Sequence, residues 1–163
     1  MANNDCLMML TKSEEDYLKA LFHICMEQEE DKAGTNQLAD YLGLSPASVN
    51  NMLKRLKEKG LVSYQKYGKV ELTEGGESMA VRLIRKQRLW ETFLFQHMNF
   101  TWDEVHEVAE QLEHIQSPKL IAELDKFLGF PQRDPHGAAI PNAQGVYPKR
   151  ARTTLSALLP GDA

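Results

Sequence analysis

Acidic and imidazole side chains gather on one side of the segment HEVAEQLEH, residues 106–114. On a helical wheel His106, Glu110, Glu113 and His114 share one face, because their spacing is i, i+4, i+7 and i+8. Clustered carboxylates and imidazoles are unfavourable unless a positive charge lies among them. A divalent cation such as Mn²⁺, Fe²⁺, Co²⁺ or Zn²⁺ meets that need. The segment is therefore a candidate metal site, and the simpler interpretation is an exposed acidic helix face.

A second group of residues has the chemistry to bind DNA. Between Ser45 and Lys69 there are six lysines and arginines and a single acid, Glu58, although the whole chain of 163 residues has a net charge of -4. DNA binding must therefore come from this local patch. Some side chains suit base edges and others suit phosphates. The first set is Ala47, Ser48, Asn50 and Asn51, and the second is Lys54, Lys66 and Lys69.

Caps and apolar spacing predict the helices that must position the DNA-binding residues. These helices begin at Ser13, Thr35 and Ser45, and they end near Gln28, at Gly43 and at Gly60. Two short runs rich in β-branched and aromatic residues follow, around a turn at Tyr67 and Gly68, which indicates a hairpin. The order predicts a winged helix-turn-helix whose third helix enters the major groove.

The second half of the chain is predicted to be helical as well. A helix over residues 78–96 has a longer apolar face than a single helix needs, so we expect it to cross between domains. Two more helices are capped by Thr101 and Ser117, and the second ends at Gly129. Residues 131–145 are rich in proline and glycine and predict a loop.

The expected fold is mainly α with a small β-hairpin wing, divided into three parts. Residues 1–76 form the winged helix-turn-helix domain, residues 77–141 form a helical domain for dimerisation and metal binding, and residues 142–163 form a tail. Cys6 and Cys25 do not indicate a disulfide framework or a metal knuckle. The sequence contains neither a membrane span nor a leader, so a cytoplasmic protein is expected.

Several motifs resemble the diphtheria toxin repressor and manganese transport regulator family of metal-dependent transcriptional repressors. These are SEEDYLKALF, RLWETFL, VHEVAEQLEHI and DPHGAAIP, within residues 13–141, and the pair EDYL and EQLEH is the most specific. The resemblance implies one ion held by Asp16, Glu110, Glu113 and His114. Carboxylates at Asp16 and Glu110 resemble the manganese-responsive branch, so the implied cofactor is Mn²⁺ or Fe²⁺, with Co²⁺ or Zn²⁺ able to bind in vitro.

Two residues depart from the family pattern. Gln87 stands where a histidine is usual, and Lys19 stands where the manganese branch has a carboxylate. A charged lysine cannot be a ligand, but its ammonium can partly replace a second cation among the acids. The resemblance also implies an ancillary metal site at Gln87, Glu91 and His106. The simpler interpretation of Glu91 and His106, which we favour, is a hydrogen bond between helices.

The expected function is a cytoplasmic repressor of metal-uptake genes, activated by Mn²⁺ or Fe²⁺. The resemblance implies a homodimer that binds a palindromic operator and no membrane. One alternative is a winged-helix regulator with a degenerate, metal-independent site, in which Lys19 supplies the charge. A remote alternative is a hydrolytic metalloenzyme, for which the sequence offers no evident nucleophile. The end of the chain, TTLSALLPGDA, resembles the first strand of an SH3-like domain or is an unstructured tail.

Overall fold

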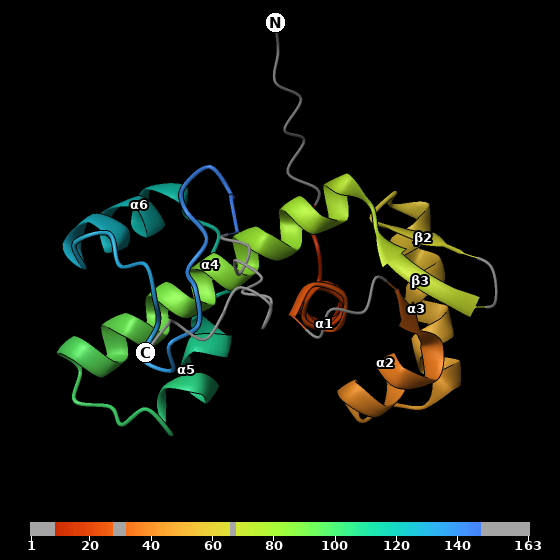
Figure 1. Ribbon diagram of the computed structural model, residues 1–163, viewed down its shortest axis with the longest axis horizontal. Helices are drawn as coiled ribbons and strands as arrows, with labels where there is room; N and C mark the ends of the chain where they lie inside the picture. Colours follow the sequence, from red (N-terminus) through yellow and green to blue (C-terminus); the bar gives the residue numbers. More distant parts are fainter. Residues whose placement is uncertain (1–8, 28–31, 66–67, 148–163) are drawn as a thin grey trace, which may run out of the picture.

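The computed structural model describes residues 9–27, 32–65 and 68–147. Its elements are α1 (Lys12–Phe22), the π-helix η1 (His23–Glu27), β1 (Ala33–Gly34), α2 (Thr35–Leu42), α3 (Pro46–Glu58), β2 (Val62–Tyr64), β3 (Lys69–Leu72), α4 (Glu74–His97), α5 (Val105–Leu112) and α6 (Pro118–Phe127). Figure 1 shows α1 to α3 and the strands around one end of α4, with α5 and α6 around the other. A mainly helical fold with a small sheet is therefore confirmed.

Local signals position α3 as the sequence predicts. The hydroxyl of Ser45 accepts the backbone N–H of Ser48 at 3.2 Å, and Pro46 occupies the first helical position. A cap of this kind stabilises a helix by about 1 kcal/mol. Gly43 ends α2 with a φ of 66°, a conformation that glycine adopts without strain. The start of α3 and the tight turn before it are thus fixed by their own residues.

The predicted caps of the first two helices are wrong. Thr11, not Ser13, caps α1, because its side chain accepts the N–H of Glu14 while the Glu14 carboxylate accepts the N–H of Thr11. This capping box gives a hydrogen-bond acceptor to two backbone N–H groups that have no partner within the helix. Thr35 is the first residue inside α2, and Gly34 precedes it without a side-chain cap bond.

The wing is a three-stranded antiparallel sheet rather than a simple hairpin. The strand order is β1-β3-β2, with Ala33 opposite Val70 and Val62 opposite Leu72. A strand as short as β1 carries no alternation that a sequence could reveal. The sheet is held close to α4 at Gly76, where a Cβ atom would lie 2.0 Å from the carbonyl oxygen of Leu61.

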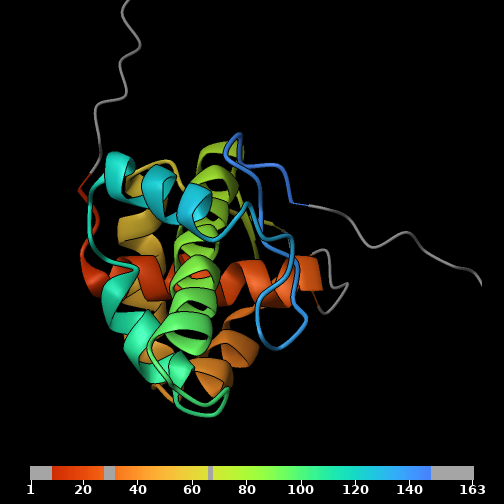
Figure 2. The ribbon, with the colours of Figure 1, turned by 90° about the vertical axis from the view of Figure 1, so that its left-hand side faces the viewer.

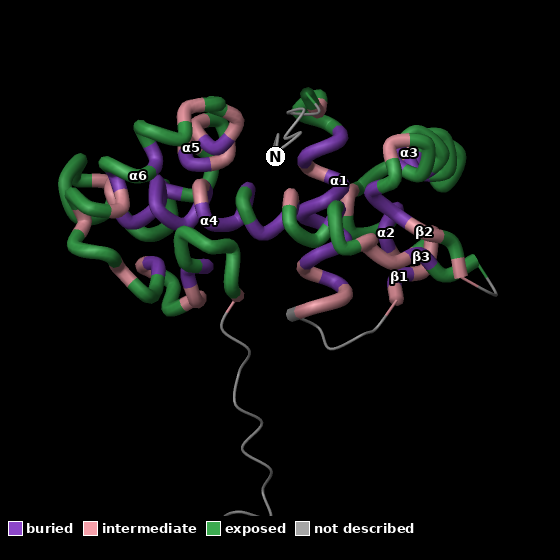
Figure 3. The backbone as a smooth tube through the Cα atoms, turned by 90° about the horizontal axis from the view of Figure 1, so that it is seen from above, coloured by how far each residue is buried: buried purple, intermediate pink, exposed green. Residues whose placement is uncertain are grey.

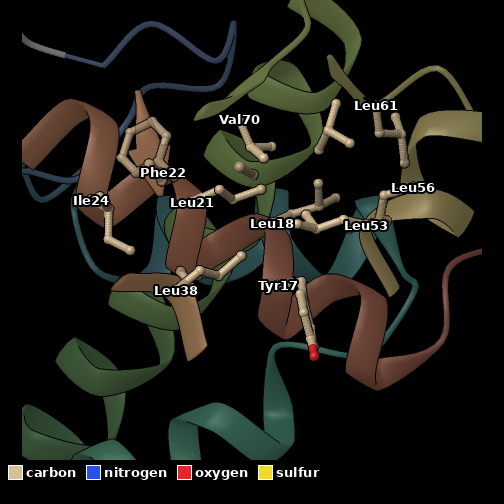
Figure 4. Packing of buried hydrophobic residues seen from close by; sticks show 14 of the residues in the cluster. Tyr17, Leu18, Leu21, Phe22, Ile24, Leu38, Leu53, Leu56, Leu61 and Val70 are labelled. Atoms are coloured by element: carbon tan, nitrogen blue, oxygen red, sulfur yellow. The ribbon is translucent and has the colours of Figure 1, made fainter. Parts of the chain in front are cut away.

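Two hydrophobic cores lie along α4, as expected for a helix that crosses between domains. The first core contains Leu18, Phe22 and Leu53, and Figure 4 shows how α1 fills its centre. Val81 and Ile84 of α4 belong to this core, whereas Leu89, Trp90 and Leu94 belong to the second core with residues of α5 and α6. Figure 3 shows α4 buried through the middle of the molecule. One rigid helix therefore connects the two halves.

The helix that carries the opening motif is shorter than predicted. Thr101 does not cap it; α5 begins at Val105, after a turn in which Thr101 N–H donates to Glu104 Oε2 at 2.8 Å, and it ends at Leu112. Carboxylates near a helix C-terminus oppose the helix dipole, which favours an early end. Figure 2 shows α5 and α6 against α4, viewed from the end that carries them. Glu113 consequently lies just beyond the helix rather than on its face.

Two sequence-based expectations concern parts of the chain for which no structure is described. The tail that resembles a strand of an SH3-like domain belongs to residues 148–163, which lie outside the described residues. Lys66 also lies outside them. Among the helices that the structure describes, none combines the length and apolar character needed to cross a bilayer.

Candidate metal centres and DNA-binding surface

The surface predicted to contact DNA is the outward side of α3. Ala47, Ser48, Asn50, Asn51 and Lys54 are all exposed. Ser48 also takes part in the helix start, since the hydroxyls of Ser45 and Ser48 are 2.9 Å apart. Lys69 is exposed at the first residue of β3. The base-contacting and phosphate-contacting candidates therefore lie on accessible parts of α3 and the wing.

Three cations of the same region are engaged within the protein. Lys59 Nζ lies 2.7 Å from a carboxylate oxygen of Glu14, and Arg55 lies 3.5 Å from the other oxygen. Burial alone would raise the pKa of Glu14, but Lys59, the backbone N–H of Thr11 and Arg55 lower it overall. Lys57 lies over the ring of Tyr64. These contacts tie α3 to α1 and to the wing.

A cluster of charged residues, which we call the interdomain cluster, joins α1 to the end of α5. Its members are Glu15, Asp16, Lys19, Glu110, Glu113 and His114. Asp16, Glu113 and His114 each offer a ligand atom within 4.8 Å of the others. Glu110 does not share that group; its Oε1 lies 3.3 Å from His106 Nε2 instead. The four ligands predicted for one ion are thus divided.

Lys19 places an ammonium inside the interdomain cluster. Its Nζ lies 2.5 Å from Glu113 Oε1 and 3.8 Å from Glu110 Oε1. Lys19 and Glu113 are both buried, with residue exposures of 6% and 0%. Burial raises the pKa of Glu113, and Lys19 opposes that rise. Lys86 is near the same acids: burial lowers its pKa, while Glu15 and Glu113 act in the opposite direction.

The remaining atoms of the interdomain cluster have the arrangement of metal ligands. His114 Nδ1 is hydrogen-bonded to Glu15. His114 Nε2 lies 3.5 Å from Glu113 Oε1 and 3.9 Å from Asp16 Oδ1. Among the described residues, His114 Nε2 and Glu113 Oε2 are buried without a hydrogen-bond partner, which is rare for buried polar atoms. The ligand atoms are therefore in place, with an ammonium beside them.

A second cluster, which we call the Glu91 cluster, consists of Glu91, Asp134 and His136. Each residue offers one ligand atom within 4.8 Å of the others. His136 Nδ1 lies 3.7 Å from Glu91 Oε2 and 3.9 Å from Asp134 Oδ2. Glu91 comes from α4, and the other two come from the loop after α6. Glu91 and Asp134 are buried, with exposures of 2% and 8%.

Hydrogen bonds at the back of the Glu91 cluster orient its ligand atoms. His136 Nε2 lies 2.9 Å from the carbonyl oxygen of Trp102, so that nitrogen donates its proton and Nδ1 keeps a lone pair toward the carboxylates. Asp134 Oδ1 accepts the N–H groups of His136 and Ala138 at 2.9 and 2.8 Å. Asp134 Oδ2 is thereby left to face Glu91 and His136.

The two carboxylates of the Glu91 cluster share a buried space. Burial raises the pKa of Asp134, and Glu91 raises it further. Burial acts to raise the pKa of Glu91 also, but hydrogen bonds from His106 and Asp134 and the charges of His106 and His136 lower it overall. Two carboxylates that lie close together in a buried space repel each other when both are ionised, and a bound cation offsets that repulsion.

The residues predicted for the ancillary site do come together beside the Glu91 cluster. Gln87 Nε2 donates to Glu91 Oε1 at 3.3 Å and lies 3.2 Å from His106 Nδ1, which is itself 3.2 Å from Glu91 Oε1. The Glu91 hydrogen bond raises the pKa of His106, against burial. The amide oxygen of Gln87 accepts from Lys19 Nζ at 3.4 Å. Gln87 therefore links the two clusters.

Sequence reasoning did not identify Asp134 and His136 as candidate ligands. Both belong to the motif DPHGAAIP, which carried the resemblance but was interpreted only as part of a loop. An acid and a histidine two residues apart in a loop were the available signal. Their place beside Glu91 depends on how that loop packs against α4, which spacing along the chain does not reveal.

Family models cover both halves of the chain. Residues 9–70 match the N-terminal DNA-binding domain of iron-dependent repressors, and residues 73–142 match the metal binding and dimerisation domain of iron-dependent repressors. The solved structure of the manganese regulator SloR has a TM-score of 0.77 and 40% identity, over 92% of this chain and 69% of that chain. The matches therefore extend over sequence and fold together.

The names of two further relatives state that they depend on a metal. A manganese-dependent transcriptional repressor in complex with manganese has a TM-score of 0.74 and 44% identity, over 83% of this chain and 61% of that chain. The iron-dependent repressor IdeR of Mycobacterium tuberculosis is 31% identical over 132 residues, which are 81% of this chain and 56% of IdeR. The chain thus spans about half the length of this curated relative.

The winged helix-turn-helix, the helical second half and these matches agree, and the expected resemblance is confirmed. The chain belongs to the iron-dependent repressor family of metal-dependent transcriptional repressors.

Proposed function

We propose that this chain is a metal-activated transcriptional repressor that controls metal-uptake genes in the cytoplasm. It acts as a homodimer on a palindromic operator when Mn²⁺ or Fe²⁺ is plentiful, and it is not an enzyme. The relatives named as manganese-dependent and iron-dependent repressors support this assignment. A division into domains near residue 76, within α4, is part of the proposal.

The observation that carries the proposal is the orientation of the Glu91 cluster. Asp134 and His136 each use one polar atom for a protein hydrogen bond and turn another toward Glu91. Metal-binding histidines commonly donate their second nitrogen to a carbonyl, as His136 does to Trp102. The residues therefore fit a divalent ion, for which Glu91 Oε2, Asp134 Oδ2 and His136 Nδ1 are the proposed ligands.

The donor types of the Glu91 cluster favour Mn²⁺ and Fe²⁺. Two carboxylate oxygens and one imidazole nitrogen suit these ions, and also Co²⁺ and Zn²⁺, better than they suit ions that prefer sulfur. When bound, the ion supplies the positive charge that allows Glu91 and Asp134 to ionise side by side. His106 is a positioning residue, since it contacts Glu91 Oε1 and not the space between the three proposed ligand atoms.

The interdomain cluster, in contrast, does not fit an ion in its present state. Glu113 Oε1 is already 2.5 Å from Lys19 Nζ, and Glu110 is directed to Lys19 and His106. No step of the proposed function depends on metal there. Its role is to hold α1 against the end of α5 by ion pairs.

The chain's own contacts connect the Glu91 cluster to the DNA-binding half. Glu91 holds His106 of α5 and Gln87 of α4, and Gln87 accepts from Lys19 of α1. Fixing Asp134 and His136 onto α4 would restrain Glu91 and, through His106, the position of α5 along α4. In a homodimer that arrangement would set the separation of the two α3 helices, which must match two operator half-sites.

Exposed aromatic side chains at the end distant from the wing support self-association. Phe95 of α4, Phe127 of α6 and Phe130 are 45%, 63% and 66% exposed. Phe127 also packs edge-on against Phe93, so it is part of a larger apolar group. Exposed groups of this kind commonly mark protein interfaces.

A DNA-binding titration tests the proposal. A random duplex library is first selected with the full chain in Mn²⁺, and the affinity for the selected DNA is then measured by fluorescence anisotropy with Mn²⁺ and with EDTA. We expect binding to be about 10- to 100-fold tighter with Mn²⁺, since allosteric coupling typically spans about 5- to 150-fold. His136→Ala should abolish the response to metal. Equal affinity in Mn²⁺ and EDTA would instead support the metal-independent regulator.

A further inference from the structure

We propose that Lys19 is a built-in cation that takes the place of a divalent ion in the interdomain cluster. Each protomer would then bind one ion rather than two, with the single ion in the Glu91 cluster, and in this last respect the inference rests on the proposed function. The α1–α5 contact would form without metal, whereas the loop that carries Asp134 and His136 would depend on it.

The ligand atoms of the interdomain cluster are already assembled around the ammonium. Asp16, Glu113 and His114 supply ligand atoms within 4.8 Å of one another, from elements that are far apart in sequence. His114 Nδ1 is hydrogen-bonded to Glu15, so Nε2 is directed toward the carboxylates of Asp16 and Glu113. Glu113 is fully buried, and its Oε2 lacks a hydrogen-bond partner within the described part of the chain. These atoms would suit an ion if the ammonium were absent.

The position of Lys19 excludes an ion from that point. An ion bonded to Glu113 Oε1 at about 2.2 Å would lie within about 5 Å of Lys19 Nζ, which is itself 2.5 Å from the same oxygen. Like charges at this distance in a buried site repel strongly. Lys19 is only 6% exposed, so water does little to screen the repulsion.

Neighbouring groups keep the ammonium where it is. Gln87 Oε1 accepts a hydrogen bond from Lys19 Nζ at 3.4 Å, and Glu110 Oε1 lies 3.8 Å from the same nitrogen. With Glu113 Oε1, three acceptor oxygens surround the ammonium. A neutral glutamine suits this role, because its oxygen accepts from the ammonium while its NH₂ group donates to Glu91. Lys19 and Gln87, the two departures from the family pattern, are thus direct partners.

The test counts Mn²⁺ ions bound by the full chain, by equilibrium dialysis and by isothermal titration calorimetry. We expect one ion per protomer in the wild type and two in Lys19→Ala, which removes the charge and leaves space. The second ion should disappear in Lys19→Ala combined with Glu113→Gln. Lys12→Ala, which removes an exposed lysine from the same helix, is the matched control and should keep one ion.

Single substitutions in the wild-type background test the same inference without any change at Lys19. Glu113→Gln should leave the Mn²⁺ stoichiometry unchanged, whereas Glu91→Gln should weaken Mn²⁺ binding by about 100-fold or more. Two ions in the wild type, no gain in a folded Lys19→Ala variant, or loss of the wild-type ion on Glu113→Gln would each overturn the inference. A wild type without bound Mn²⁺ would overturn the proposed function, yet a Glu113-dependent ion in Lys19→Ala would still support the role of Lys19.

Discussion

The interdomain cluster and the Glu91 cluster contain the same kinds of ligand but neutralise their buried carboxylates differently. Each has an aspartate, a glutamate and a histidine with one ring nitrogen already hydrogen-bonded. In the interdomain cluster Lys19 lies 2.5 Å from the glutamate. In the Glu91 cluster histidines lie beside the glutamate instead, with His106 Nδ1 3.2 Å from Glu91 Oε1 and His136 Nδ1 3.7 Å from Glu91 Oε2. Two similar sets of candidate ligands therefore differ in whether a lysine already lies beside the buried glutamate.

The difference shows that burial creates a need for positive charge without specifying its source. Two unit charges 4 Å apart interact by about 4 kcal/mol at an effective dielectric constant of 20, and a divalent ion doubles that figure. A tethered ammonium provides part of this stabilisation permanently. A free ion provides it only when its concentration is sufficient, which is why we propose that the Glu91 cluster, and not the interdomain cluster, responds to metal.

The largest expected effect comes from removing the tethered charge. Lys19→Ala leaves Glu113 buried and unpaired, which should lower the free energy of unfolding of the metal-free protein by about 3 kcal/mol. Urea denaturation in EDTA measures the loss, and Mn²⁺ should restore part of it. Lys19→Ala with Glu113→Leu should lose less than Lys19→Ala alone, because no buried charge is then left. A loss below about 1 kcal/mol in the single variant would contradict the comparison.

Removing a ligand from the other cluster should act on metal affinity instead. Glu91→Gln should weaken Mn²⁺ binding by about 100-fold or more, since even supporting residues of metal sites contribute about 10- to 100-fold. Isothermal titration calorimetry gives the value. Glu110→Gln is the contrasting variant: because Glu110 contacts Lys19 and His106, it should change the affinity far less. Equal losses in the two variants would mean that the clusters share their ion.

The ion pair between Lys59 and the buried Glu14, inside the DNA-binding half, provides a comparison that metal should not influence. Lys59→Met should lower the free energy of unfolding at pH 7 by about 1 kcal/mol, because Lys59 is partly exposed and Arg55 remains near Glu14. The folded state holds the pKa of Glu14 below its usual value. The stabilisation is therefore present at neutral pH and is lost as the pH falls through the folded-state pKa.

Urea denaturation of the wild type and Lys59→Met at several pH values measures this dependence. The difference between them should shrink toward acid pH and should be the same with Mn²⁺ and with EDTA. A difference that grows in acid would show that Glu14 does not carry the effect.

The smallest effect is expected outside both clusters. Lys54→Ala on α3 should weaken DNA binding by about fivefold, similarly for all sequences, and reduce the slope of log affinity against log salt by about one. Anisotropy titrations at several salt concentrations measure both quantities. Mn²⁺ affinity should be unchanged, and a change in it would link the DNA surface to the metal clusters in a way that the contacts do not explain.

Local signals allowed much of the DNA-binding half to be predicted from the sequence. The Ser45 cap, Pro46 and the left-handed Gly43 act within a few residues, so spacing alone identifies them. The first helix was misjudged because two hydroxyl residues were available, and only Thr11 has a glutamate three positions later that completes the capping box. Strand β1 could not be predicted, because its two residues form a strand through pairing with β3, which is distant in the sequence.

The interdomain cluster and the Glu91 cluster could be predicted only in part from the sequence. The face shared by His106 and Glu110 was predicted correctly, but Glu113 lies beyond the end of α5, and the helical wheel could not show that. Lys19 was expected to supply charge among the acids, and it does contact Glu113. Asp134 was missed, because only the packing of its loop brings it to α4. Contacts between distant segments therefore decide which ligands belong together.

Crystals of the full chain grown with Mn²⁺ would test the central comparison most directly, through an anomalous difference map at the manganese absorption edge. We expect one peak per protomer, between Glu91 Oε2, Asp134 Oδ2 and His136 Nδ1. We expect none beside Asp16, Glu113 and His114, where Lys19 should keep its contact with Glu113. A peak in the interdomain cluster with Lys19 displaced would contradict the proposed role of Lys19.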